Sequence, residues 1–221
     1  MHDNLYNYLF MKDDIDATKQ KIIQAWLGTG SINIFGPQFA GKDTQGRMLA
    51  KAFNGSLIGG GDIIRNRVVP KELKDTVATG KLVPSEDYVK TVLPYLTRSE
   101  FRDGPLILSA VGRWHGEEES VIKVASKSHH PLKAVIYLRL ENDIVWQRWQ
   151  RHSEIGDREI RRDDSREGLQ MRLEEFHEKT LPVIDFYRDK GILIEIDGSL
   201  SPQKTFDEVI NELFKHAQAL G

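Results

Sequence analysis

The sequence predicts an α/β fold in which one parallel sheet lies between layers of helices. Five short apolar runs, each bounded by turn or polar residues, alternate with segments of helical periodicity. The runs are nearly continuous in aliphatic residues, which is typical of strands buried on both faces of a parallel sheet. A loop rich in small residues, with one lysine, separates the first run from the helix that follows it. Strand alternating with helix indicates repeated βαβ units.

The same patterns predict where each element lies. We expect strands at residues 31–35, 56–58, 105–109, 134–138 and 192–196. We expect helices at residues 14–27, 42–53, 85–96, 142–151, 165–190 and 201–219. The helix at 85–96 begins at a serine followed by acidic residues, a favourable start for a helix.

Composition excludes several classes of protein. The length of 221 residues suits one α/β domain with a small insertion. The net charge of −2 argues against a general nucleic-acid binder. The absence of cysteine excludes disulfides, thiol catalysis and cysteine-bound zinc. Because no signal peptide and no apolar stretch of about 18 residues is present, we expect a cytoplasmic protein without a membrane partner.

The strongest local signal is the loop GPQFAGKDT, residues 36–44, between the first strand and the next helix. Small residues let backbone N–H groups converge on phosphate oxygens, and the amino terminus of a helix adds partial positive charge. Lys42 supplies a charge for the β and γ phosphates. The alternative is a Gly/Pro turn followed by a chance lysine. The predicted contacts with a nucleoside triphosphate are Gly36, Gln38, Phe39, Ala40, Gly41, Lys42, Asp43 and Thr44.

One residue of this loop opposes phosphate binding. Asp43 stands directly after Lys42, where the common motif has Ser or Thr, and Thr44 follows it. A carboxylate about 5 Å from a phosphate charge costs on the order of 3 kcal/mol at an effective dielectric constant of 20. We therefore hypothesise that Asp43 helps to hold Mg²⁺, directly or through water. The alternative is that its side chain points into solvent.

Arginine is concentrated in the carboxyl half of the chain. Residues 134–178 contain eight arginines and no lysine. Arginine suits planar, bidentate phosphate recognition. Arg148 and Arg151 lie three apart on one predicted helix and so share a face. For Arg158, Arg162 and Arg166 we favour the alternative of surface salt bridges with neighbouring acidic residues.

From about Ser31 onward the chain resembles the adenylate kinase family of nucleoside monophosphate kinases. Five features occur in the order of that family, and together they are specific. They are the loop GPQFAGKDTQ, Gly61-Asp62-Ile63-Ile64-Arg65, Gly80-Lys81-Leu82-Val83-Pro84, Arg113 after the third strand, and Arg161-Arg162-Asp163-Asp164 followed by Arg172.

The resemblance implies a P-loop NTPase fold, a three-layer α/β/α arrangement with a five-stranded parallel sheet. It places an insertion that binds the nucleoside monophosphate (NMP) at about residues 62–95. A short lid is expected at about 151–161. The kinase domain would span 31–221, with residues 1–30 as a helical extension. We expect a monomer.

The resemblance also implies the reaction, transfer of the γ-phosphoryl group of ATP to an NMP with Mg²⁺, with AMP as the default acceptor. Arg148 resembles the arginine that packs on the donor's base. Arg65 and Arg113 would hold the acceptor's phosphate. The implied acceptor contacts are Gly60, Arg65, Lys81, Val83, Arg113, Glu117, Arg161 and Arg172. The implied catalytic cations are Lys42, Arg113, Arg151, Arg161 and Arg172. Phosphoryl transfer depends mainly on positioning and charge stabilisation, which explains the need for cations.

The sequence departs from the family pattern near the metal. The family's third strand ends in an aspartate that orients the water shell of the metal, and Ser109 stands in its place. The extra carboxylate of Asp43 is a candidate for a relocated acidic partner. The loss of that aspartate leaves open a non-catalytic, nucleotide-binding relative. A kinase acting on another small molecule is a third, less favoured hypothesis.

Base recognition differs as well. Gly60 replaces a threonine that reads adenine, and Glu117 replaces a glutamine. An ionised glutamate can only accept hydrogen bonds, which suits the two donors of guanine. Alternatively, residues 117–119 form a solvated helix start. GMP and pyrimidine monophosphates therefore remain alternative acceptors. Trp114 could stack on a base or cover the core, and we favour the core.

Overall fold

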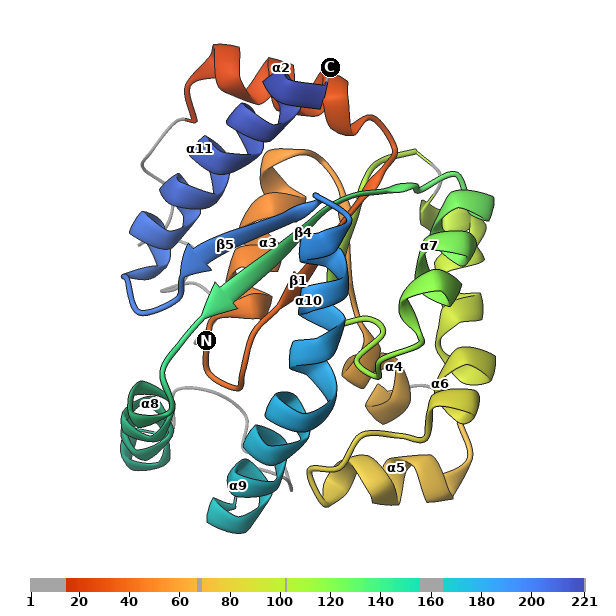
Figure 1. The fold of residues 1–221 in the computed structure, drawn as a ribbon, viewed down its shortest axis with the longest axis vertical. Helices are drawn as coiled ribbons and strands as arrows, with labels where there is room; N and C mark the ends of the chain where they lie inside the picture. The colour runs from red at the N-terminus through yellow and green to blue at the C-terminus, as the bar shows by residue number, and fades with distance from the viewer. Residues whose placement is uncertain (1–14, 67–68, 102, 156–164, 221) are drawn as a thin grey trace.

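The computed structural model describes residues 15–66, 69–101, 103–155 and 165–220. Its centre is one parallel sheet with the strand order β2-β3-β1-β4-β5 (Figure 1). The strands are β1 (Ser31–Phe35), β2 (Ser56–Gly59), β3 (Leu106–Ser109), β4 (Leu132–Arg139) and β5 (Leu193–Asp197). The predicted fold class and all five predicted strands are therefore confirmed.

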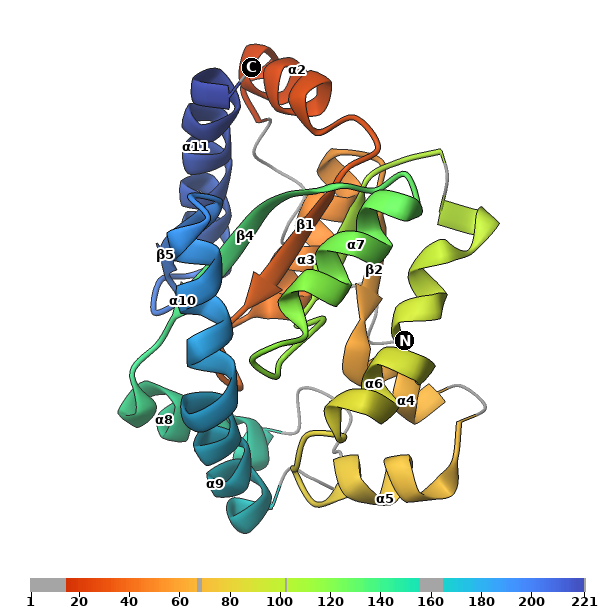
Figure 2. The same cartoon turned by 45° about the vertical axis from the view of Figure 1, so that its right-hand side comes forward.

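Helices cover both faces of the sheet (Figures 1 and 2). One layer contains α2 (Ala17–Leu27), α3 (Lys42–Ala52) and α11 (Pro202–Leu220). The other contains α7 (Glu118–Lys127) and α10 (Leu181–Asp189). After β2 come α4 (Gly60–Asn66), α5 (Lys71–Ala78), α6 (Ser85–Thr91), η1 (Leu93–Thr97) and η2 (Ser99–Phe101). Helix α8 (Asn142–Ile155) follows β4, and α9 (Arg166–Glu175) continues through the π-helical η3 (Phe176–Thr180) into α10.

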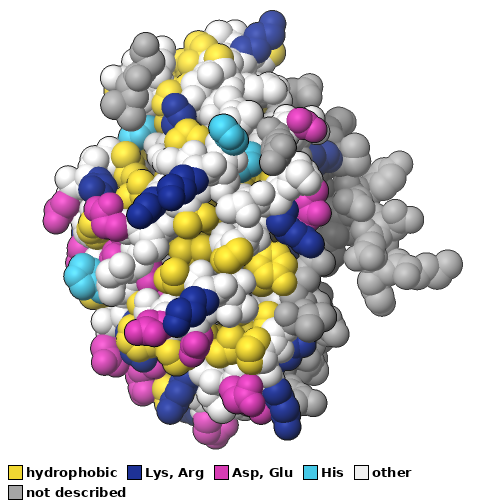
Figure 3. Space-filling model, turned by 90° about the vertical axis from the view of Figure 1, so that its right-hand side faces the viewer, with side chains coloured by type: hydrophobic (Ala, Val, Ile, Leu, Met, Phe, Trp, Pro, Cys, Tyr) yellow, Lys and Arg dark blue, Asp and Glu magenta, His cyan; other side chains and the backbone are white. Residues whose placement is uncertain are grey.

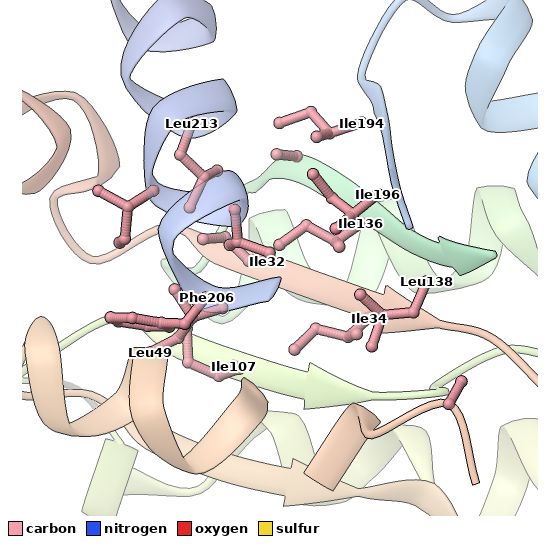
Figure 4. Close-up of a cluster of buried hydrophobic side chains, with 14 of the residues drawn as sticks. Ile32, Ile34, Leu49, Ile107, Ile136, Leu138, Ile194, Ile196, Phe206 and Leu213 are labelled. Atoms are coloured by element: carbon pink, nitrogen blue, oxygen red, sulfur yellow. The ribbon is translucent and has the colours of Figure 1, made fainter. Parts of the chain in front are cut away.

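Alternate residues of the strands form the two halves of the core. Ile32 and Ile34 of β1 point to the layer of α3 and α11, where Leu49 and Phe206 pack on them (Figure 4). Phe35 lies in a separate cluster with residues of α10. Every residue of β1 is buried, as expected for the central strand of a sheet covered on both sides.

The amino-terminal helix belongs to this core. Ile23 and Leu27 of α2 are fully buried in the cluster that α11 helps to form. The sequence alone left open whether this helix packs on the sheet layer or on a partner, and it packs within the chain. The domain boundary at residue 30 stays a prediction.

Some helices differ from the sequence expectation. Helices α4 and α5 were not expected as separate elements, because α4 begins with two glycines and α5 is short and follows Pro70. Helix α7 was foreseen only as the alternative of a helix start at 117–119. The helix expected at 85–96 changes to a 3₁₀ turn at η1, which contains Pro94 near its start. The helix expected at 165–190 is interrupted by the π-helical turn of η3.

The surface over α5, α6 and α7 is mixed in character. Apolar side chains lie there between lysine, arginine and acidic side chains (Figure 3). Among the residues that the structure describes, no helix combines the length and the hydropathy needed to cross a bilayer.

The sheet order places a binding site at one edge. β1 lies between β3 and β4, and the connections on its two sides run in opposite directions along the sheet. In open α/β sheets, ligands bind outside the carboxyl ends of the strands at such a switch point. The loop of residues 36–41 leaves β1 at that edge.

Replacing Leu49 by Ala should lower the free energy of unfolding by about 2–5 kcal/mol, because Leu49 is fully buried between α3 and the sheet. Urea denaturation of both proteins measures this change. Lys51→Ala, at an exposed position of the same helix, serves as the control and should change stability by less than about 0.5 kcal/mol. An equally small effect for Leu49→Ala would contradict the packing described for α3.

Candidate active site

The loop after β1 is shaped to bring backbone N–H groups together. Gly36 lies against β4, and a Cβ there would approach the Leu138 carbonyl oxygen to 2.7 Å. Gly41 caps α3 with a φ of +91°, in the left-handed region that favours glycine. Phe39 also has a positive φ, +60°, which is uncommon for a bulky residue and occurs preferentially at binding sites.

Lys42 is held against this loop. Its Nζ donates to the carbonyl oxygens of Gly36, at 2.9 Å, and of Pro37, at 2.7 Å. The ammonium group is therefore already positioned beside the backbone that the sequence predicts to contact phosphate.

The loop opens onto a cleft of about 770 Å³. The cleft lies at the carboxyl ends of β1, β2 and β3, and α9 contributes one wall. Six cationic side chains line it, namely Lys42, Arg47, Arg65, Lys81, Arg113 and Arg172. Three carboxylates line it as well, namely Asp43, Asp62 and Glu117. A cleft with excess positive charge in a chain of net charge −2 concentrates anions.

The structure brings most of the predicted site residues together in this cleft. Those that line it are Gln38, Phe39, Gly41, Lys42, Asp43, Thr44, Arg65, Lys81, Val83, Arg113, Glu117 and Arg172. Those that do not line it are Gly36, Ala40, Gly60, Arg148 and Arg151. Arg161, Asp163 and Asp164 lie outside the described residues, as does most of the predicted lid.

Arg148 holds two loops together. Its guanidinium donates to the carbonyl oxygen of Phe39 at 2.9 Å and to that of Ser199 at 3.0 Å. The phosphate loop is thereby tied to the loop between β5 and α11. Arg151, one turn further along α8, is exposed.

The Asp43 side chain points across the cleft to the end of β3. The Ser109 hydroxyl donates to Asp43 Oδ1 at 2.8 Å. Ser109 is buried, with 7% of its surface exposed. The alternative that Asp43 points away into solvent is therefore wrong, because its carboxylate is hydrogen-bonded to Ser109.

On the side of β2, the first turn of α4 carries an ion pair. Arg65 donates to Asp62 Oδ1 at 2.7 Å. The Arg65 guanidinium also packs on Gly61, where a Cβ would lie 3.0 Å from its terminal nitrogens. Across the cleft, the Arg172 side chain of α9 lies against Gly80, which has a φ of +86°.

Trp114 is not a core residue, contrary to the expectation from sequence. It lines the cleft, and its indole Nε1 donates to the Val83 carbonyl oxygen at 2.8 Å. Lys179 Nζ lies 4.2 Å from the centre of its ring. The Glu175 carboxylate accepts from that ammonium, at 2.5 Å, and from the Leu82 N–H, at 3.1 Å. These contacts join the loop after β3 and the segment before α6 to the helix of α9 and η3.

The loop after β3 also depends on buried charges. Arg113 leaves this loop toward the cleft, and the Thr180 hydroxyl donates to its carbonyl oxygen at 3.3 Å. Burial lowers the pKa of the Arg113 guanidinium, although Tyr88, Glu175 and Glu117 act in the opposite direction. An arginine stays charged at any physiological pH. The π-helical turn that carries Thr180 is a feature frequent at functional sites.

Glu117 stabilises the same loop. Its Oε2 accepts from the backbone N–H of Arg113 at 2.8 Å and of Trp114 at 3.1 Å. Only 1% of the residue is exposed. Burial raises the pKa of the Glu117 carboxyl and the neighbouring Glu118 adds to the rise, whereas the two backbone N–H groups and the Ser85 hydroxyl oppose it. Glu117 precedes α7, so the alternative of a helix start at 117–119 is confirmed in its position, but Glu117 is buried and not solvated.

Sequence analysis missed several residues of the cleft. Arg47 lies one turn beyond Asp43 on α3, and helical spacing from the phosphate loop is a signal that could have found it. Tyr88 and Ala110 also line the cleft, and neither belongs to a pattern that predicts a contact.

The phosphate loop after the central strand of this sheet defines a P-loop nucleotide-binding protein. The family model described as adenylate kinase matches residues 34–192. The chain is 31% identical over 176 residues to the adenylate kinase of Bartonella bacilliformis, covering 76% of this chain and 91% of that protein. It is 29% identical over 191 residues to that of Bifidobacterium longum, covering 84% and 98%. It is 30% identical over 185 residues to that of Parvibaculum lavamentivorans, covering 81% and 88%.

The chain belongs to the adenylate kinase family, an assignment that its sequence motifs had predicted. It is therefore an ATP-dependent phosphotransferase of the nucleoside monophosphate kinase class.

Glu117 should make stability depend on pH. Its carboxyl binds a proton more tightly in the folded than in the unfolded chain, where the pKa is about 4.3. Between that value and the raised folded pKa, increasing pH favours the unfolded state. Glu117→Gln should therefore gain stability relative to the wild type as the pH rises from 4 to 7. Urea midpoints across this range measure the difference. Exposed Glu119→Gln serves as the control and should track the wild type; parallel curves for Glu117→Gln would count against a raised pKa.

Proposed function

We propose that this protein transfers the γ-phosphoryl group of ATP to a nucleoside monophosphate, releasing ADP and a nucleoside diphosphate. The observation that supports this most directly is the convergence of Lys42, Arg65, Arg113 and Arg172 on one cleft. They come from four segments that are distant in sequence. Such a set of cations suits two polyphosphate tails that face each other.

Each cation has a role in this proposal. Lys42 and the N–H groups of its loop bind the β and γ phosphates of ATP. Arg65 and Arg113 bind the phosphate of the acceptor. Arg172, on the opposite wall, neutralises charge that develops on the transferring group. In phosphoryl transfer a single arginine at that position can be worth roughly 10³–10⁵ in rate.

The remaining predicted residues complete the arrangement. Arg148, which borders the phosphate loop, packs on the donor's base, and Lys81 and Val83 contact the acceptor. Residues 62–95 form the insertion that binds the monophosphate. Residues 151–161 form the lid, with Arg151 and Arg161 closing over the phosphates to exclude water. The protein acts as a monomer.

AMP is the default acceptor, because the relatives reported above are named adenylate kinases. GMP is the second candidate, favoured by the carboxylate of Glu117 in the wall of the cleft. A non-catalytic relative is less favoured, because an unused site would not be expected to keep six cations in one cleft.

The cleft suits Mg²⁺ as the partner of ATP. Asp43 and Thr44 line it side by side at the start of α3, and they offer carboxylate and hydroxyl oxygens. The described residues contain no group of three His, Cys, Asp or Glu that could hold a metal by themselves. Mg²⁺ is usually held by one or two carboxylates together with substrate phosphates and waters. The ion would neutralise charge on the phosphates.

In this proposal Asp43 supplies the acidic partner of the metal. The Ser109 hydroxyl orients its carboxylate from the end of β3. The ion would also remove the repulsion between Asp43 and the triphosphate, which otherwise costs on the order of 3 kcal/mol. In this arrangement the carboxylate that serves the metal comes from Asp43 on α3, and the end of β3 contributes only the Ser109 hydroxyl.

Incubation with Mg-ATP and, separately, AMP, GMP, CMP, UMP and dTMP should give ADP with at least one acceptor. Lys42→Met should lower kcat by at least about a hundredfold, because a positioned charge is lost. Lys51→Met, exposed on the same helix and outside the cleft, is the matched control and should stay within about twofold. ATP binding without turnover of any acceptor would favour the non-catalytic relative. ATP turnover only with some other compound would favour a different kinase.

Asp43→Asn should weaken the enhancement of ATP affinity by Mg²⁺ by about tenfold to a hundredfold, the range for residues that orient a metal's ligands. Calorimetric ATP titrations with and without Mg²⁺ measure this ratio. The double change Asp43→Gly with Ser109→Asp returns the carboxylate to the strand and should restore the ratio to within about threefold. Ser109→Asp alone adds a second negative charge and should not improve it. An unchanged ratio in Asp43→Asn would refute the role of Asp43.

A further inference from the structure

Near the ends of β2 and β3, the hydroxyl of Tyr88 occupies the space that a side chain at Gly60 would fill. A Cβ added to Gly60 would lie 2.4 Å from Tyr88 Oη and 3.3 Å from the Ala110 carbonyl oxygen. Tyr88, on α6, is 7% exposed and lines the cleft. Its phenol therefore brings a hydroxyl to the wall where position 60 has no side chain of its own.

This hydroxyl has a proton to donate. Tyr88 Oη accepts from the Gly112 N–H at 3.2 Å, and none of the hydrogen bonds among the described residues uses the phenol proton. Burial raises the pKa of Tyr88, so the phenol keeps its proton at neutral pH. The cleft wall thus offers a hydrogen-bond donor at this point.

An acceptor lies on the same wall. Glu117 Oε2 is used by two backbone N–H groups, whereas Oε1 is buried without a hydrogen-bond partner in the described part of the chain. Ser85 favours the charged carboxylate, but no donor among the described residues has hydrogen-bond geometry toward Oε1. A buried carboxylate oxygen without a donor is unfavourable. A ligand that brings N–H groups to this wall would satisfy it.

We infer that Tyr88 and Glu117 read the base of the acceptor, and that this base is guanine. The inference rests on the proposed function and replaces AMP by GMP as the preferred acceptor. Guanine presents an oxygen, O6, beside two donors, N1–H and the 2-amino group. The Tyr88 hydroxyl donates to O6, and Glu117 Oε1 accepts from the adjacent N–H groups.

The other bases fit this pair less well. Adenine has an unprotonated N1 beside its amino group, so a carboxylate that accepts from the amino group also faces a lone pair. Cytosine has the same fault at N3, and uracil offers one N–H where guanine offers two. Hydrogen bonds to an ionised acceptor are about twice as strong as neutral ones. The preference for guanine should therefore be about tenfold to a hundredfold, the range measured for a good two-point contact with a base.

The structural role of Glu117 supports this reading. Oε2 holds the loop that carries Arg113, so one carboxylate links the contact with the base to the residue proposed to bind the acceptor's phosphate. Because the loop fixes the carboxylate before any ligand binds, little side-chain entropy is lost on binding. If Glu117 served the loop alone, its replacement would affect all acceptors equally.

Glu117→Gln tests the inference, because the amide keeps the size of the side chain and an oxygen for the two backbone N–H groups. Its NH₂ group replaces Oε1 and can donate to adenine N1, but it opposes guanine N1–H. We expect the wild type to favour GMP over AMP by at least tenfold in kcat/KM, and the variant to lower this ratio by at least tenfold. Tyr88→Phe should lower kcat/KM for GMP by about fivefold to tenfold. Calorimetric titration of each monophosphate should show the same changes in affinity.

Glu118→Gln is the matched control. Glu118, the first residue of α7, is also buried, and its Oε2 accepts from the Gly116 N–H of the same loop at 2.6 Å, but it does not line the cleft. Its replacement should leave the ratio of GMP to AMP unchanged. An unaltered ratio in Glu117→Gln, or a wild type that prefers AMP, would overturn the inference and leave the proposed function standing. Absence of turnover with every monophosphate would instead refute the proposed function, and the titrations with GMP and AMP would still decide which base the cleft binds.

Discussion

The central constraint on this structure is the repulsion among cations that must share one cleft before any phosphate arrives. Six cations line the space at the carboxyl edge of the sheet. Local oxygen atoms stabilise several of them. Lys42 donates to two carbonyl groups of its own loop, Arg65 pairs with Asp62, and the surroundings of Arg113 include the carboxylates of Glu175 and Glu117. These three cations are thus positioned by neighbours that a phosphate can replace or complement.

The sheet makes this concentration of charge possible because its strands are rigid and their ends coincide. β1 is buried along its whole length, and the segments that follow β1, β2 and β3 open onto the same side. The loop after β3 is held from three directions. Glu117 binds its backbone, Trp114 joins it to the segment before α6, and Thr180 of the π-helical turn binds the Arg113 carbonyl group. A displacement of this loop would therefore move residues on both sides of the cleft.

Two positions at which the sequence differs from the expected motifs, Ser109 and Gly60, each lie beside a polar side chain from another element. The sequence motifs led us to expect an aspartate where Ser109 stands at the end of β3, and the carboxylate of Asp43 on α3 is hydrogen-bonded to this serine. The motifs likewise led us to expect a threonine where Gly60 stands, and the phenol of Tyr88 occupies the space beside this glycine. In the first pair the carboxylate comes from α3 and lies at the end of β3, and in the second the hydroxyl comes from α6 and lies beside Gly60.

The sequence by itself determined the strands, the phosphate loop and the family. These features depend on local patterns that can be recognised within a short segment of the chain. Examples are the apolar run at 31–35 and the spacing of Gly36, Gly41 and Lys42. Only the tertiary structure decided where Asp43 points, that Trp114 faces the cleft, and that Tyr88 meets Gly60. Each of these contacts joins residues from different elements, and 66 positions separate Asp43 from Ser109. No periodicity along the chain encodes such a contact, because it depends on how helices pack on the ends of the sheet.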